Sequence, residues 1–184
     1  MSDEAASGTA FQDLYPDDVA HCYGCGRLNE RGHRLRSFWD GDETVARFTP
    51  EPYHSAVPGY VYGGLIASLV DCHGTGTAAA VGARTAGWRL GVDPLPEGEH
   101  APRYVTAALE VSYLKPTPLG PPLLLRGVVE DAGEEKGSRK VVTRVTVEVA
   151  GDVTASGRVV AVRMPEALVR AVARDPERGT LRHG

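Results

Sequence analysis

One acidic side chain stands out because of its surroundings in the sequence. Asp71 is the only residue with a full charge at neutral pH between Glu51 and Arg84. The run 63–81 lacks proline, and its apolar residues recur at the spacing of an α-helix. On that helix Asp71 shares a face with small residues, and no base lies three or four positions away to pair with it. An acid on a face that another chain or a ligand can approach closely is a candidate base or nucleophile.

The alternative is that Asp71 is solvated on an exposed helix face. Such faces are usually rich in Lys, Arg and Glu, and this one carries no other charge. The pattern therefore favours a buried groove over a solvated surface.

The cysteines and one histidine offer a second possible chemistry. Cys22 and Cys25 have the spacing of half a zinc site, with histidines nearby, but the chain has no second Cys-x-x-Cys. Because a structural zinc ion needs four convergent ligands, we expect no metal and a tight turn with buried thiols. Cys72 and His73 fall on the apolar helix face, so we expect core packing, with His73 as a hydrogen-bonded core histidine.

Composition limits the classes of function. A chain of 184 residues suits one domain, and a net charge of −4 with three lysines and no basic stripe argues against nucleic acid as a partner. No apolar run approaches the roughly 20 residues of a membrane span, and the acidic start is unlike a secretory signal. Three cysteines, an odd number, fit a reduced compartment. We expect a cytoplasmic protein with no membrane or nucleic-acid partner.

Other segments of the chain have the pattern of strands. Asp40-Gly41-Asp42 is a hairpin turn signal between the first two of them, and loops rich in Pro and Gly cover 50–59 and 84–103. In 139–149 valines alternate with more polar residues, as expected when one sheet face is buried. The predicted strands are 35–39, 44–48, 105–114, 123–130, 139–149 and 154–164.

These elements predict the domain organisation and the fold class. We expect residues 1–20 to be a flexible lead, disordered to about residue 12, and residues 21–165 to form the folded domain. Residues 166–184 should form a short C-terminal helix and tail, and the cluster 134–137 a hairpin tip. Two strands, a long buried helix and a meander of four strands predict an α+β fold in which an antiparallel sheet curls around the helix.

Three segments carry motifs that match one known family. They are Tyr62-Gly63-Gly64-Leu65-Ile66-Ala67-Ser68-Leu69-Val70-Asp71, Cys22-Tyr23-Gly24-Cys25-Gly26 with Asn29 and 32–36, and Leu109-Glu110-Val111-Ser112-Tyr113-Leu114-Lys115-Pro116 with Gly120. These segments resemble the hotdog-fold acyl-CoA thioesterases of the PaaI-like (phenylacetate-degradation) family, and the resemblance covers roughly residues 20–165. In that family His-Gly-Gly begins the central helix, and an acid follows nine positions after the histidine.

The resemblance implies roles for individual residues. Asp71 matches the catalytic acid, which attacks the thioester or activates water, and Gly63 matches the glycine whose N–H faces the thioester oxygen. Thr106 matches a hydroxyl that holds the attacking water and that the other subunit contributes. A helix N-terminus is suited to an oxyanion because its N–H groups are unpaired and partly positive.

The chain departs from the family at two positions. Tyr62 stands where the family has histidine, and a phenol can donate a hydrogen bond but does not titrate near neutrality. Ala56 stands near the place where some members have a water-orienting Asn, and His54 could take over that role or be a loop histidine with no role.

The remaining candidates would bind substrate. Gly64 lies in the helix motif, and Lys115, Arg139 and Lys140 are candidates for the phosphates of coenzyme A, although exposed bases at strand ends are usually only solvated.

The function expected from the resemblance is hydrolysis of an acyl-CoA or acyl-carrier-protein thioester in a homodimer or homotetramer. No cofactor is expected, since coenzyme A would enter as part of the substrate. Two alternatives stay open: a hotdog protein that binds acyl-CoA without catalysis, which Tyr62 favours, and a hotdog hydratase or dehydratase, which Tyr62 disfavours.

Overall fold

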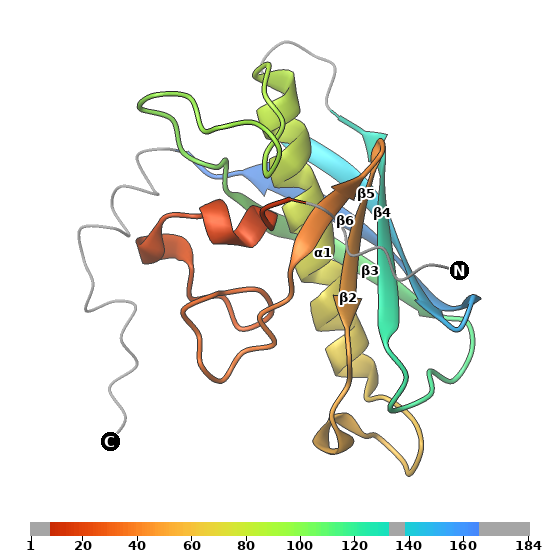
Figure 1. Cartoon of the computed structure of the whole chain (residues 1–184). Coiled ribbons are helices and arrows are strands. Elements are labelled where there is room, and N and C mark those ends of the chain that lie inside the picture. The colour runs from red at the N-terminus through yellow and green to blue at the C-terminus, as the bar shows by residue number, and fades with distance from the viewer. Residues whose placement is uncertain (1–7, 133–138, 166–184) are drawn as a thin grey trace.

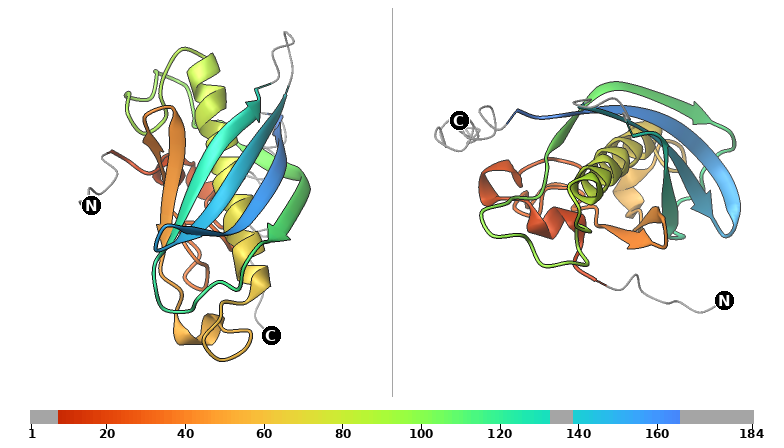
Figure 2. Two further views of the ribbon diagram at one scale, coloured as in Figure 1. Left: turned by 90° about the vertical axis from the view of Figure 1, so that its right-hand side faces the viewer. Right: turned by 90° about the horizontal axis from the view of Figure 1, so that it is seen from above.

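A single long helix with an antiparallel sheet curled around it forms the protein. The computed structural model describes residues 8–132 and 139–165 (Figure 1). Viewed from above, the sheet wraps one side of the helix, and the N-terminal segment and a long loop cover the other (Figure 2). This confirms the predicted α+β arrangement. The elements are the helix α1 (Gly63–Thr85) and the strands β1 (Ser37–Asp40), β2 (Glu43–Phe48), β3 (Tyr104–Tyr113), β4 (Leu123–Asp131), β5 (Lys140–Val149) and β6 (Asp152–Arg163).

The strand order corrects one part of the prediction. Neighbours in the sheet are β1-β2-β4-β5-β6-β3, so β3 pairs with β6 at the sheet edge and is not the first strand of a four-strand meander. The connection from β3 to β4 holds four prolines, and it meets the loop before α1 through the bridge between Tyr60 and Pro118. Proline lacks the N–H that a hairpin ladder needs, so the chain crosses over and does not turn back.

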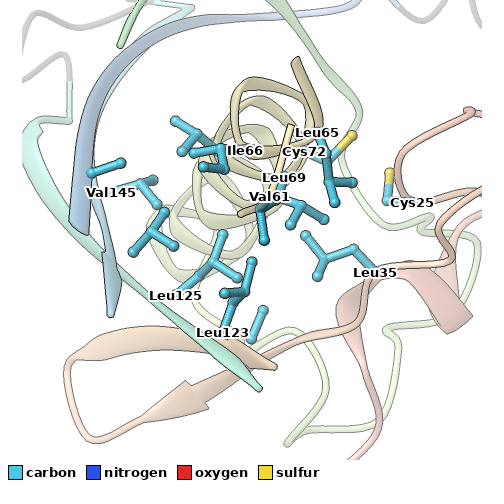
Figure 3. Packing of buried hydrophobic residues seen from close by; sticks show 14 of the residues in the cluster. Cys25, Leu35, Val61, Leu65, Ile66, Leu69, Cys72, Leu123, Leu125 and Val145 are labelled. Atoms are coloured by element: carbon cyan, nitrogen blue, oxygen red, sulfur yellow. The ribbon is translucent and has the colours of Figure 1, made fainter. Parts of the chain in front are cut away.

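The apolar face of α1 packs on the inner face of the sheet. Leu65, Ile66 and Leu69 are buried against inward-facing residues such as Leu125 of β4 and Val145 of β5 (Figure 3). The inward residues of β5 alternate with outward ones, as the sequence predicted.

The N-terminal segment corrects another expectation. Phe11 and Gln12 are almost completely buried, and the Phe11 ring meets Trp39 edge-to-face at 5.7 Å between centroids. The flexible lead predicted for residues 1–20 is therefore wrong for residues 8–20, which include two short 3₁₀ turns, Phe11–Leu14 and Asp17–Val19. The predicted C-terminal helix and hairpin tip lie outside the described residues.

This segment and the sheet together bury the C-terminal half of α1. Ala78 and Ala83, toward the helix C-terminus, are fully buried in a cluster with Phe11, Trp39 and Leu90. Toward the N-terminus, Ala67, Ser68, Asp71 and Thr75 on the same face are only half-buried. The opening on this face is thus confined to the stretch that contains Asp71. None of the helices in the described part of the chain combines the length and apolar character needed to cross a membrane.

A buried chain of hydrogen bonds joins the helix to the sheet and the N-terminal segment. His73 Nε2 lies 3.2 Å from the Thr44 carbonyl oxygen, which can only accept, so Nε2 carries the proton and Nδ1 accepts from Ser37 Oγ at 2.9 Å. Gln12 donates to the same hydroxyl oxygen at 3.1 Å and accepts from the Ser37 N–H at 2.8 Å. The prediction of a hydrogen-bonded core histidine is confirmed.

This burial should make stability depend on pH. Burial lowers the pKa of His73 to about 4 from its ordinary value of 6.5. As pH falls from 6.5 to 4, the His73 imidazole becomes protonated in the unfolded chain but stays largely neutral in the folded chain. The free energy of unfolding should therefore fall by about 3 kcal/mol. Urea unfolding at several pH values should show this loss, and His73→Gln should show a flatter dependence. The exposed His100→Gln is the control, and equal pH dependence of all three proteins would contradict the assignment.

Candidate active site

Asp71 lies a little more than two turns into α1, and its carboxylate faces β3. The Thr106 hydroxyl, on β3 of the same chain, donates to Asp71 Oδ1. The resemblance implied that a partner subunit contributes this hydroxyl, and within the single chain Thr106 already lies beside Asp71. No Lys, Arg or His pairs with Asp71 within the described residues. One carboxylate oxygen is thus held in place by a neutral donor.

The surroundings of Asp71 favour its neutral form more than water does. Desolvation by burial raises the pKa of Asp71, the hydrogen bond from Thr106 lowers it, and the negative charge of the Cys22 thiolate adds to the rise. A raised pKa makes a carboxylate a stronger base than one in water, so the site suits proton abstraction from water.

The second part of the site is the N-terminus of α1. The N–H groups of Gly63 and Gly64 have no acceptor among the described residues. Tyr113 of β3 donates to the Gly63 carbonyl at 2.8 Å, and a Cβ at Gly63 would lie 3.3 Å from its ring. A groove of about 520 Å³ opens here, and Lys115 lies on its wall. Tyr113 is a contributor that sequence reasoning missed, since nothing in the sequence shows that β3 ends beside the helix start.

Tyr62 is the residue before the helix and is 58% exposed. Its ring folds back over Gly64, where a Cβ would lie 2.5 Å from the phenol oxygen. The phenol therefore lies against Gly64 at the start of the helix, and a side chain at position 64 would have to displace this exposed ring.

The two parts of the site are separated along the helix. Gly63 and Asp71 are eight residues apart, which at 1.5 Å per residue corresponds to about 12 Å. The carbon and oxygen of one thioester carbonyl cannot bridge that distance. Within a single chain, the acid and the unpaired N–H groups do not converge on one reacting group.

The side chain of His54 lies at neither part, although its carbonyl oxygen accepts from the Tyr62 N–H at 2.8 Å. Its ring packs against His33, Phe48 and Tyr53, and its Nδ1 accepts from the Glu51 N–H at 2.9 Å. These residues line a separate hollow of about 240 Å³ that includes neither Gly63 nor Asp71. Within the single chain, the structure does not bring the His54 imidazole to the site.

The three basic candidates are also separated. Lys115 lines the groove beside Gly63 and forms an ion pair with Asp152 at 2.6 Å. Arg139 donates to the Arg163 carbonyl at 2.6 Å. Lys140 precedes the inward-facing Val141, so its side chain lies on the outer face of the sheet, where it pairs with Asp131 at 3.7 Å. Only Lys115 lies at a part of the site.

Comparison with known proteins identifies the family. A thioesterase superfamily protein from Shewanella loihica PV-4 is 43% identical, with 81% of this chain and 98% of that chain covered and a TM-score of 0.58. A thioesterase from Haemophilus influenzae shares 15% identity, with 76% and 85% covered and a TM-score of 0.56.

The E. coli PaaI protein from the phenylacetic acid degradation operon shares 16% identity, with 72% and 81% covered and a TM-score of 0.52. At these identities the last two show the fold alone. No family model and no curated protein sequence matches the chain. The identity to the Shewanella protein over nearly its whole length confirms the family indicated by the helix motif, and the chain belongs to the thioesterase superfamily with the hotdog fold of PaaI.

Proposed function

We propose that the protein hydrolyses acyl thioesters of coenzyme A, with Asp71 as the base or nucleophile. One observation carries the proposal: Asp71 is a half-buried carboxylate with no cation beside it among the described residues, and Thr106 holds one of its oxygens. In a chain of the thioesterase superfamily, that arrangement suits attack on a thioester.

The reaction needs only this carboxylate, water and the thioester. As a base, Asp71 takes a proton from water, and the hydroxide oxygen bonds to the carbonyl carbon. As a nucleophile, it forms an acyl anhydride that water then cleaves. In both routes the carbon–sulfur bond breaks, and the thiol leaves with a proton. Because Thr106 donates to Oδ1, the other carboxylate oxygen stays available for the reaction.

The oxyanion must be stabilised by a second chain. The unpaired N–H groups that suit it lie about 12 Å from Asp71 of the same helix. A second copy of the chain could pair with the edge strand β3, because the outer edge of this strand has no partner in the described part of the chain. It is ten residues long and exposes Val105, Leu109 and Tyr113. A long apolar edge strand is a template for pairing with another chain.

Antiparallel pairing of two β3 strands would complete the site. Tyr113 contacts Gly63 at one end of β3, and Thr106 contacts Asp71 at the other. A two-fold axis near Leu109 and Glu110 would place Tyr113 of one chain across from Thr106 of its partner, with strands about 4.8 Å apart. The helix N-terminus of each chain would then face the acid of the other, giving a homodimer with two equivalent sites.

The groove beside Gly63 is the proposed entry for coenzyme A. Its wall combines apolar residues with Lys115, whose partner Asp152 is exposed. A phosphate could compete with that carboxylate for the ammonium group at little cost, because exposed ion pairs contribute little free energy.

Removal of the Asp71 charge tests the proposal. Asp71→Asn keeps size and hydrogen bonding but removes the anion, so thiol release from acyl-CoA should fall by about 10²–10⁴-fold. Thr106→Ala should cost less, because it removes a positioning group and leaves the carboxylate. Asp18→Asn, an exposed acid on a 3₁₀ turn, is the control and should match the parent. Activity of folded Asp71→Asn within a few-fold of the parent would remove Asp71 from the reaction, and no thiol release by the parent itself would favour a binding protein.

Two substitutions at Gly63 test the role of the N–H group. Proline suits the first helical position, and Tyr62 already has the extended conformation required before proline. Gly63→Pro therefore removes the N–H and keeps the helix, and turnover should fall by about 10²–10³-fold. Gly63→Ala crowds Tyr113 in the same way but keeps the N–H, so its loss should be much smaller. Equal losses in steady-state kinetics would show that crowding alone is responsible.

Tyr62 is proposed to donate to the acyl oxygen where the family has histidine. Tyr62→Phe should lower kcat/KM without changing the thermal midpoint, because the ring is mostly exposed. Tyr62→His should keep or raise activity, since either nitrogen of the imidazole can donate. If both variants behave like the parent, the phenol only packs over Gly64.

A further inference from the structure

All three cysteines of the chain meet at one point beside α1. The Sγ atoms of Cys22, Cys25 and Cys72 all lie within 4.8 Å of one another, and those of Cys22 and Cys72 are 3.7 Å apart. Figure 3 shows the Cys25 and Cys72 sulfurs at the same margin of the core. The sequence shows only half a zinc site here, and the third sulfur comes from the helix, 47 residues after Cys25 in the chain.

We propose that these three cysteines bind a zinc ion, with water as the fourth ligand. Two sulfurs of a tetrahedral zinc site, each about 2.3 Å from the metal, lie about 3.8 Å apart, and the separation of Cys22 and Cys72 matches this value. The side chain of Cys22 is half-buried, which leaves room for water, whereas Cys25 and Cys72 are buried.

The turn that carries the first two cysteines is built to reach the helix. A Cβ at Gly24 would lie 2.3 Å from Cys72 Sγ, so glycine permits the close approach. A Cβ at Gly26 would lie 2.4 Å from the Cys22 nitrogen, and the Gly26 N–H closes the turn on the Cys22 carbonyl at 2.7 Å.

The surroundings also suit the charge of the proposed site. Three thiolates on Zn²⁺ leave one negative charge, and the positive charge of the Arg103 guanidinium, which acts on Cys25, would partly neutralise it.

The geometry favours a metal over a disulfide. A disulfide would join two of the sulfurs and leave the third without a bonded partner, whereas a metal uses all three. The proposed ion would fasten the segment before β1 to α1 next to Asp71. Its role would be structural, and zinc binding would release the remaining thiol protons. This inference does not depend on the proposed hydrolysis.

Metal titration of the full chain tests the proposal. The protein is purified with a non-thiol reductant, stripped of metal, and titrated with Zn²⁺ in competition with a chromophoric chelator. We expect one zinc ion per chain and a higher thermal midpoint in the zinc form. Titration with Co²⁺ should produce the charge-transfer absorption of thiolate ligands.

Cys72→Ser should weaken zinc binding by more than the roughly 10–100-fold that loss of an outer partner costs. Cys22→Ser, at a half-buried position, should do the same if Cys72→Ser does not fold. Ser68→Ala is the matched control, because Ser68 lies beside Gly24 and is not a ligand, and it should bind zinc as the parent does.

Two results would overturn the site: no stoichiometric zinc in the reduced parent, or parent-like affinity in both cysteine variants. A disulfide found by mass spectrometry with zinc present would also overturn it and assign the cluster to thiol oxidation.

Discussion

The rise of an α-helix is the constraint on which the proposed site depends. The unpaired N–H groups at Gly63 and the acid at Asp71 lie on one helix, eight residues apart, and helix geometry fixes their separation at about 12 Å. A thioester carbonyl is far smaller than that, so in the proposed mechanism one chain supplies the acid and its partner supplies the oxyanion site. Two features would allow a second chain to bind: the exposed edge of β3 and the open stretch of the helix around Asp71.

The rest of the fold holds this helix in place on every other side. The sheet buries its apolar face, and the segment around Phe11 joins the sheet in burying its C-terminal half. His73 links the helix to the sheet through buried hydrogen bonds to Ser37 and Thr44, and Gln12 joins the N-terminal segment to Ser37. Buried polar groups that find all their partners specify one arrangement of a core. The position of Asp71 relative to β3 therefore follows from contacts far from the acid itself.

Local sequence patterns predicted the helix and the strands. They did not predict how these elements are arranged, because the arrangement depends on contacts between residues far apart in the sequence. The helix, the strands and the isolation of Asp71 are visible in the sequence because periodicity and charge spacing are local properties. The placement of β3 beside β6 is not visible in the sequence, because it depends on which edge of the folded sheet is open for pairing. The same applies to Phe11, which is buried only because Trp39 and the helix alanines leave room for it, and to Cys72, which meets Cys25 only in the folded chain.

Mixing two inactive variants tests the shared site most directly. Asp71→Asn keeps an intact helix N-terminus, and Gly63→Pro keeps an intact acid. If the site is shared, a heterodimer holds one complete site and one doubly defective site, and equal amounts refolded together should recover about a quarter of wild-type thiol release. Refolding each variant alone is the control. Recovery of no activity in the mixture, with both chains folded and associated, would contradict the account.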